Sequence, residues 1–353
     1  MPSERKTQHK LYEADSRNLS IIEDSSVDLV VTSPPYPMIE MWDRLFFSFN
    51  KEIEEKMRIN ESMNAFELMH RELDKVWEEC YRILKVGGIM CIVIGDAVRT
   101  IDGRFRLFSS HSRILAKAVQ MGMYVLPSII WNKPTNAPNK FLGSGTLPVG
   151  AYVKMEHEHI LIFRKGDKRK FSGDDNILRR ISSIFWEERN EWYSDIWRGV
   201  NGKRQGLNGE GSRNRSAGFP LEIPRRLISM FSSIEDTVFD PFLGEGTTVT
   251  ASILLERNSV AVEIERDLID QYCKNIVFQT NYLNKLIDER HMRHRDFIQK
   301  NSQNEWKYFN DFLKMPVVTA NERWIQFNRL SEIVLNENGN NNVSELIAFY
   351  DEC

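Results

Sequence analysis

The tetrapeptide Ser33-Pro34-Pro35-Tyr36 has the composition of an active-site turn. It follows the short, β-branched run 27–32, which predicts a buried strand. Two consecutive prolines prevent both a continuing strand ladder and an α-helix, so the chain leaves the strand at its carboxyl end, where open α/β sheets bind ligands. A hydroxyl, two free carbonyls and an aromatic ring suit an unstacked nucleobase. The alternative is an ordinary turn with an exposed serine and a packed tyrosine.

A second segment, residues 237–248, predicts a strand, a glycine turn and a helix. Gly244 and Gly246 allow the backbone to approach a ligand closely, and Thr247 and Thr248 can cap the helix that begins there. The next predicted strand, 259–262, ends at Glu263, which is placed to bind ribose hydroxyls. We therefore expect a cofactor that contains a nucleoside.

The same segment favours a cofactor without phosphates. A nicotinamide dinucleotide is the usual ligand of such a turn, but Val249 stands where the third glycine of that fingerprint belongs. Asp240 also places a carboxylate where it would repel a pyrophosphate. A cationic, phosphate-free ligand such as S-adenosylmethionine fits these residues better.

The order of the motifs resembles that of the amino-methylating DNA methyltransferases of the β class, in which the catalytic motif precedes the cofactor motif. The matching segments span most of residues 11–275. They are 12–16, 33–36, 84–88, 131–134, 157–161, 215–220 and 240–248. One departure is Arg215-Ser216, where the family often has His-Pro.

The resemblance implies an α/β, Rossmann-like methyltransferase fold with a mostly parallel, seven-stranded sheet and one antiparallel strand. It implies methyl transfer from S-adenosylmethionine to an exocyclic amino group of a DNA base. Ser33 and Pro34 would accept the amino hydrogens and Tyr36 would stack on the flipped base, with Pro35 shaping the turn. The implied cofactor-binding residues are Asp15, Ala217, Phe219, Pro220, Asp240, Phe242, Gly244, Gly246, Thr247, Thr248 and Glu263.

Serine at the first catalytic position favours cytosine N4 as the methylated atom, because relatives that act on adenine N6 usually carry aspartate there. A hydroxyl can donate to cytosine N3 and accept from N4, although adenine presents a similar pair of atoms. Adenine N6 therefore stays open, as do an RNA or protein amide methyltransferase and a silent DNA-binding module. We expect a restriction-modification enzyme that acts on double-stranded DNA and has a possible partner endonuclease.

The middle of the chain is locally basic although the net charge is −3. Residues 165–226 contain 14 Lys and Arg against 9 Asp and Glu, interleaved with aromatic and amide side chains. This mixture predicts phosphate contacts and base readout, and the alternative is a solvated connection above packed aromatics. The expected DNA-binding residues are Lys168, Arg169, Lys170, Arg179, Arg180, Lys203 and Arg204.

Other features narrow the class of protein. The 353 residues contain no apolar run of membrane-spanning length and no signal-peptide core, so we expect a cytoplasmic protein. The four cysteines lack metal-ligand spacing. The sequence His157-Glu158-His159 could hold a metal, but no third ligand is indicated nearby, so no metal site is predicted.

The motifs divide the chain into four predicted parts. Residues 1–166 and 214–280 form the catalytic and cofactor-binding parts of one methyltransferase domain, and 167–213 form a target-recognition region. Residues 281–353 are polar and are predicted to form a helical C-terminal extension.

Overall fold

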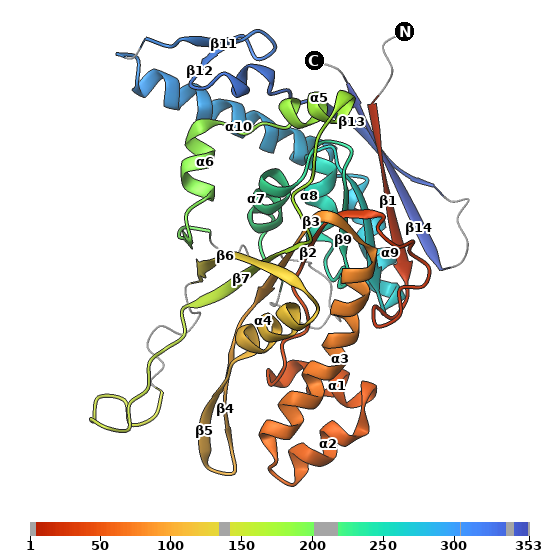
Figure 1. The fold of residues 1–353 in the computed structure, drawn as a ribbon, viewed down its shortest axis with the longest axis vertical. Helices are drawn as coiled ribbons and strands as arrows, with labels where there is room; N and C mark the ends of the chain where they lie inside the picture. Colours follow the sequence, from red (N-terminus) through yellow and green to blue (C-terminus); the bar gives the residue numbers. More distant parts are fainter. Residues whose placement is uncertain (1–4, 134–141, 201–217, 304, 337–341, 352–353) are drawn as a thin grey trace.

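The computed structural model describes residues 5–133, 142–200, 218–303, 305–336 and 342–351. Its centre is a ten-stranded sheet in the order β13-β14-β1-β10-β9-β2-β3-β7-β6-β8 (Figure 1). The catalytic strand β2 (Val27–Thr32) lies between β9 and β3 and is parallel to both.

Seven of these strands form the predicted methyltransferase sheet. Neighbours from β1 to β3 are parallel, and β7 runs antiparallel to β3 and β6. The α/β fold class and the mostly parallel sheet are thus confirmed. The other six strands of this sheet are β1 (Arg5–Glu13), β10 (Asn258–Glu263), β9 (Thr237–Asp240), β3 (Leu84–Ile94), β7 (His157–Lys165) and β6 (Met123–Asn132). The sheet as a whole has ten strands rather than the predicted seven, and besides β7 a second strand, β14, runs antiparallel to its neighbour β1.

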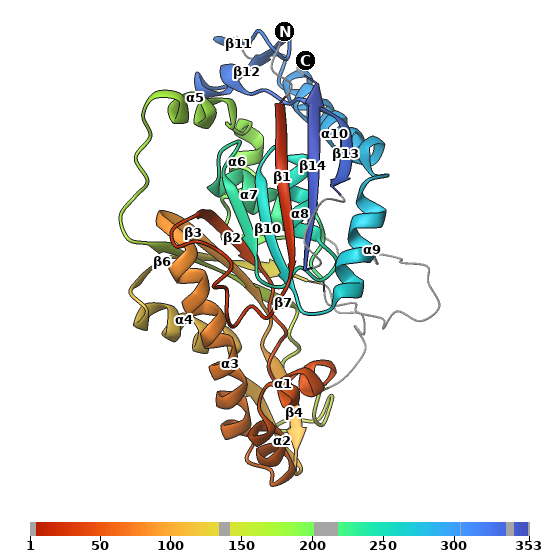
Figure 2. The same ribbon diagram turned by 90° about the vertical axis from the view of Figure 1, so that its right-hand side faces the viewer.

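Helices cover both faces of the sheet at its centre. On one face lie α3 (Ser62–Ile83) and α4 (Ser110–Gln120), and on the other α7 (Glu222–Phe231), α8 (Thr247–Leu254) and α9 (Arg266–Ile276) (Figure 2). Because both of its faces are covered, β2 is buried at every position. No helix in the described part of the chain is long and apolar enough to cross a membrane.

The prediction of a helical C-terminal extension is only partly right. Helix α10 (Thr280–Lys300) is followed by strands, two of which extend the central sheet beyond β1. Strand β14 (Val343–Asp351) alternates between buried and less buried positions, as a strand covered on one face must. The others are β11 (Tyr308–Asn310), β12 (Met315–Val317) and β13 (Arg329–Asn336), with a short 3₁₀ helix at Asn321–Trp324.

Several segments project beyond the carboxyl edge of the parallel strands, at the bottom of Figures 1 and 2. They are the 3₁₀ helix Glu40–Trp42, α1 (Asp43–Phe49), α2 (Lys51–Arg58), the hairpin of β4 (Ala97–Ile101) and β5 (Arg104–Phe108), and the loop 142–156. At the top, beyond the amino edge, lie α5 (Gly173–Ile181) and the β11–β12 pair. Helix α6 (Trp186–Trp192) connects this end to β8 (Ile196–Trp197).

Candidate active site

Loops at the carboxyl ends of β1, β10, β9 and β2 meet at one edge of the sheet. The Ala14 N–H donates to the Glu263 carbonyl at 3.1 Å, which joins the first two loops. The Thr32 hydroxyl donates to Asp240 Oδ1 at 2.7 Å, which joins β2 to β9. The catalytic and cofactor motifs, about 200 residues apart in the chain, are therefore neighbours, as the sequence predicted.

A chain of hydrogen bonds fixes the catalytic turn. Ser33 Oγ donates to Tyr36 Oη at 3.2 Å, and Tyr36 Oη donates to Glu158 Oε2 at 2.9 Å. Lys133 Nζ donates to the other oxygen of Glu158 at 2.7 Å. Because an ionised carboxylate only accepts hydrogen bonds, Glu158 fixes the direction of this chain. The lone pairs of Ser33 are left free to accept a hydrogen from a ligand.

Tyr36 is held closely on its other side. Burial raises the pKa of its phenol well above the ordinary value, and the nearby charge of Glu158 raises it further, so the phenol stays protonated. A Cβ at Gly95 would lie 3.0 Å from Tyr36 Cε2. A side chain at position 95 would therefore crowd the Tyr36 ring, and glycine leaves room for it.

The cofactor turn differs from the prediction in how its helix begins. Gly246 is the N-cap of α8, with a φ of 75°, and neither threonine side chain caps the helix. Thr247 and Thr248 are buried inside its first turn instead. The Thr248 hydroxyl donates to the Val31 carbonyl at 3.3 Å, which ties the cofactor turn to the catalytic strand.

Two carboxylates at this turn, the buried Asp240 and the partly buried Glu263, lack a cationic partner among the described residues. Burial raises the pKa of Asp240 to about 7, although the Thr32 hydroxyl and the Phe242 N–H both donate to it. Burial also raises the pKa of Glu263, which accepts the Gly244 N–H at 3.0 Å and two further backbone N–H groups. Such a pair favours a ligand with positive charge.

Other predicted cofactor residues border the same edge. Asp15 follows β1, where burial alone would raise its pKa, but its bonds to the guanidinium of Arg17 lower that pKa. Phe242 packs edge to face against Trp77, with ring centroids 6.2 Å apart. Phe219 and Pro220 are buried, and Ala217 lies outside the described residues.

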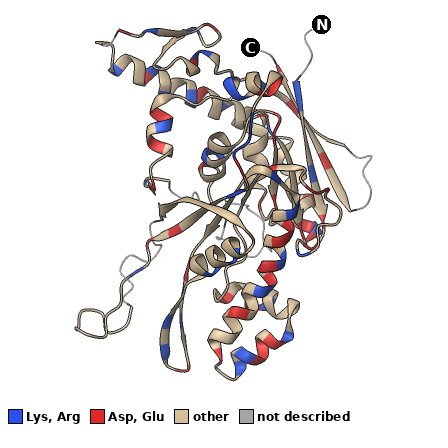
Figure 3. Ribbon diagram, viewed as in Figure 1, with Lys and Arg blue, Asp and Glu red and all other residues tan. Residues whose placement is uncertain are grey.

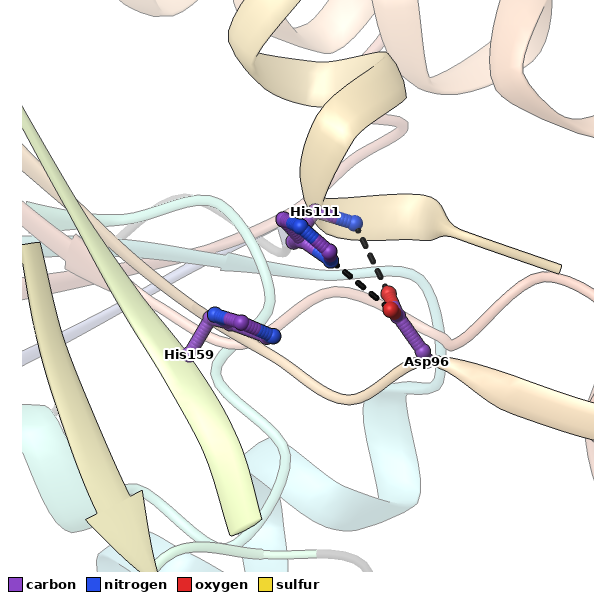
Figure 4. Close-up of side chains that lie close together, drawn as sticks. All are labelled: Asp96, His111 and His159. Atoms are coloured by element: carbon purple, nitrogen blue, oxygen red, sulfur yellow. Dashed lines mark hydrogen bonds and ion pairs between the residues drawn. The ribbon is translucent and has the colours of Figure 1, made fainter. Parts of the chain in front are cut away.

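Asp96, His111 and His159 form a second polar cluster that the sequence did not indicate (Figure 4). Asp96 accepts His111 Nδ1 at 2.7 Å and the His111 backbone N–H at 3.0 Å, so it caps the start of α4. The two imidazole rings are stacked, with centroids 3.8 Å apart and planes at 19°. In-plane lone pairs of stacked rings run side by side and do not converge, so these side chains form a bonded and stacked group rather than a preformed metal site.

The basic segment lies apart from this edge. Arg169 Nη1 is 2.7 Å from Asp236 Oδ1 and 3.3 Å from Asp28 Oδ1, and Asp28 stands at the amino end of β2. Lys168 and Lys170 are exposed beside it. The DNA-binding role of these three residues remains a prediction, now placed at the edge opposite Ser33.

Two more arginines of the basic segment pack on aromatic rings. The guanidinium of Arg179 lies 4.5 Å from the ring centre of Phe171, and that of Arg180 lies 5.6 Å from that of Trp324. The predicted contacts Lys203 and Arg204 lie outside the described residues.

Glu158 and Lys133 are the site residues that motif analysis missed as functional. The sequence placed Glu158 between two histidines of a possible metal site, and Lys133 in a motif without a role. The contact of Glu158 with Tyr36 depends on strand β7 lying beside β3, which no local pattern specifies.

Comparison with known proteins agrees with this geometry. Residues 27–275 match the family model described as DNA methylase. The chain is 43% identical over 323 residues to the Type II methyltransferase M.MthZI of Methanothermobacter thermautotrophicus, which covers 91% of this chain and 90% of the relative. It is 52% identical over 273 residues to the Type II methyltransferase M.MjaI of Methanocaldococcus jannaschii, which covers 74% of this chain and 89% of that one.

A solved structure with the same fold is that of a Thermus thermophilus protein assigned as a DNA modification methylase and crystallised in complex with S-adenosylmethionine. The TM-score is 0.59 at 31% sequence identity, over 75% of this chain and 92% of that one.

Proposed function

This chain belongs to the DNA methylase family, and we propose that it methylates the exocyclic N4 amino group of cytosine in double-stranded DNA. Family membership confirms the broader prediction of a DNA methyltransferase that depends on S-adenosylmethionine. The choice of cytosine N4 over adenine N6 is the finer part of the proposal.

The observation that carries the proposal is a hydroxyl, rather than a carboxylate, at the first position of the catalytic turn. Ser33 is partly exposed, and its hydroxyl proton is directed toward Tyr36. It can therefore accept a hydrogen from an amino group. When cytosine binds, rotation of the hydroxyl would also allow it to donate to N3.

The turn also provides the geometry that the reaction needs. An aminopyrimidine nitrogen is a poor nucleophile because its lone pair is conjugated with the ring. Acceptors at Ser33 Oγ and the Pro34 carbonyl favour a pyramidal nitrogen, whose lone pair can attack a methyl group in line. Tyr36, fixed by Glu158, supplies a face on which the flipped base stacks.

The carboxylates at the cofactor turn suit the cofactor. S-adenosylmethionine supplies an activated methyl group on a cationic sulfur and carries no phosphate. Asp240 and Glu263 have no Lys or Arg partner in the described ranges, so a cationic ligand would supply the missing countercharge. We assign the nucleoside to the edge formed by Asp15, Glu263 and Phe242.

Two relatives are named as Type II methyltransferases, which supports a role in a restriction-modification system. In such a role the enzyme would methylate one recognition sequence and protect it from a partner endonuclease.

Mass spectrometry of nucleosides tests the proposal. Unmethylated genomic DNA is incubated with the protein and isotopically labelled S-adenosylmethionine, and is then digested. We expect labelled N4-methylcytosine. Labelled N6-methyladenine would reject cytosine N4 and leave the family assignment intact, and unlabelled DNA would reject both.

A further inference from the structure

We propose that the β4–β5 hairpin and the loop 142–153, together called the arm, hold DNA beside the site where the target base is flipped. This inference rests on the proposed function and goes beyond it, because it assigns the DNA contacts to segments outside the predicted recognition region.

The arm begins beside the catalytic turn. Strand β4 begins two residues after Gly95, which lies against Tyr36. The base of the hairpin is closed by Asp96, whose carboxylate accepts bonds from Ser109 and His111 just beyond β5. The loop is followed by β7, which begins at His157 and carries Glu158, the partner of Tyr36 and Lys133. Both parts of the arm therefore project from the side of the sheet on which a flipped base must enter (Figures 1 and 2).

One face of the hairpin is basic. Arg99 pairs with Arg106 across the hairpin and Ile101 with Arg104, so all three arginines share a face. Like charges directly opposite one another repel, and only Arg99 is compensated, by bonds of 3.0 and 2.7 Å to Asp43 of α1. Within the described residues, Arg104 and Arg106 have no acidic partner. Figure 3 shows this basic hairpin projecting from the molecule.

Uncompensated arginines on a projecting ribbon suit phosphate groups. Guanidinium groups bind phosphate oxygens with two parallel hydrogen bonds, and such contacts set the position of a protein on DNA. Arg99, held by Asp43, fixes the hairpin against α1, while Arg104 and Arg106 remain available to a ligand.

The other face of the hairpin carries the loop. The rings of Phe105 and Tyr152 are stacked, with centroids 4.4 Å apart and planes at 12°, so the two parts form one unit. In this loop Leu147 is 66%, Val149 100% and Val153 89% exposed, and Leu147 and Val149 lie in the tip beyond the bridge between Gly143 and Ala151. Residues 142–153 contain no charged side chain.

An apolar tip beside a basic face is better suited to contact with DNA than to exposure to solvent. Exposed apolar side chains mark interaction surfaces, and proteins that distort DNA insert such side chains between base steps. An inserted side chain would help to unstack the target base, which flipping requires. The predicted contacts Lys168 and Arg169, by contrast, lie at the amino edge, separated from Ser33 by the length of β2.

Two matched double variants test the basic face. Arg104→Ala/Arg106→Ala removes the two arginines of the hairpin that have no acidic partner among the described residues, and Lys168→Ala/Lys170→Ala removes two exposed lysines at the opposite edge. Binding to a fluorescent duplex of random sequence is measured by anisotropy at several salt concentrations. We expect the arm variant to bind about 10-fold more weakly at moderate salt, with a salt slope shallower by about 1.8. The Lys168→Ala/Lys170→Ala variant measures the contribution of the predicted recognition region separately.

A third variant, Leu147→Ser/Val149→Ser, tests the tip. Methylation of duplex DNA should slow by about 10-fold, while methylation of single-stranded DNA, in which bases are already unpaired, should stay near the wild-type rate. Equal losses on both substrates, or none, would reject insertion by the tip.

Calorimetric S-adenosylmethionine affinity shows that each variant is folded, because the arm lies outside the cofactor turn. If the wild-type protein methylates DNA but binding is lost only in the Lys168/Lys170 variant, the arm is rejected and the proposed function stands. If the arm serves a protein partner instead, DNA binding and methylation are unchanged in all three variants, which also rejects it. A wild-type protein that methylates no DNA rejects the proposed function itself.

Discussion

At the scale of single residues, the direction of the hydrogen bonds around Ser33 decides what the catalytic turn can do. The carboxylate of Glu158 accepts a hydrogen bond from the phenol of Tyr36, and the phenol oxygen accepts one from the hydroxyl of Ser33. Tyr36 of the turn and Glu158 of β7 thus make Ser33 an acceptor. The Ser33 oxygen is therefore preorganised to accept a hydrogen bond from an amino group before the base binds.

Ser33→Ala should slow methyl transfer by about 100-fold, because the reacting nitrogen loses one preorganised acceptor. Cofactor affinity should stay near normal. Single-turnover kinetics with enzyme in excess over DNA measure the chemical step directly. A variant with the wild-type single-turnover rate would remove Ser33 from the mechanism.

Glu158→Gln should slow the same step by about 10-fold or more, although Glu158 is a positioning residue that need not touch the base. An amide can donate to Tyr36 as well as accept, so the direction of the hydrogen-bond chain is no longer fixed, and a bond to a charged group is lost. The single-turnover rate should fall while the dissociation constant of S-adenosylmethionine does not change. Glu158→Asp is the conservative control, and equal single-turnover rates in wild type and Glu158→Gln would contradict the role.

Asp240 predicts a pH effect whose sign is fixed by its environment. Its folded-state pKa of about 7 lies above the ordinary value of 3.8. The group therefore favours folding at low pH, and that contribution, about 4 kcal/mol, is lost as the pH rises from about 4 to about 7. A cationic cofactor beside Asp240 would lower its pKa and release a proton. Calorimetry near pH 6.5 in buffers of different ionisation enthalpy should detect this release in wild type and not in Asp240→Asn, and equal proton release in both would refute it.

At the scale of elements, the cofactor turn depends on a glycine that both curves the chain and leaves room for a ring. A Cβ at Gly246 would lie 2.3 Å from the ring of Tyr272, and the φ of 75° is unfavourable for other residues. Gly246→Ala should cost about 3 kcal/mol of unfolding free energy and abolish tight cofactor binding.

Gly103→Ala is the matched control, because Gly103 has a φ of 68° but nothing within 4 Å of its added Cβ. It should cost only the backbone strain, about 1 kcal/mol. Denaturant unfolding measures both variants. Equal losses would mean that the contact with Tyr272 adds nothing to the strain.

The elements also show what the sequence could and could not predict. The β-branched run before Ser33 defined β2 to the residue, because a strand covered on both faces is apolar throughout. The β4–β5 hairpin was missed, although Asp102-Gly103 between alternating side chains is a strong hairpin signal, and both residues have positive φ. The contacts of Glu158 and the grouping of Asp96 with His111 and His159 arise from strand order, which no local pattern contains.

At the scale of the whole molecule, the C-terminal segment completes the sheet that carries the site. Without β13 and β14, β1 would become an open edge strand. Strands β13 and β14 also bury Leu330, Leu346 and Tyr350. The Tyr350 hydroxyl donates to the Ile253 carbonyl in α8 at 2.7 Å. Helix α8 starts at the cofactor turn, so the contact of the C-terminal segment with α8 stabilises the helix that positions this turn.

Truncation after Asn328 should therefore destabilise the methyltransferase domain itself, with a lower melting temperature, aggregation and loss of S-adenosylmethionine binding. Leu346→Ala is the milder companion: its side chain is fully buried, so the cavity should cost about 2 to 5 kcal/mol while DNA preference stays unchanged. Calorimetric melting and cofactor titration measure both. A truncated protein that melts with the full chain and binds the cofactor equally well would show that the parallel sheet is stable without its added edge, and would leave the C-terminal segment free for another role.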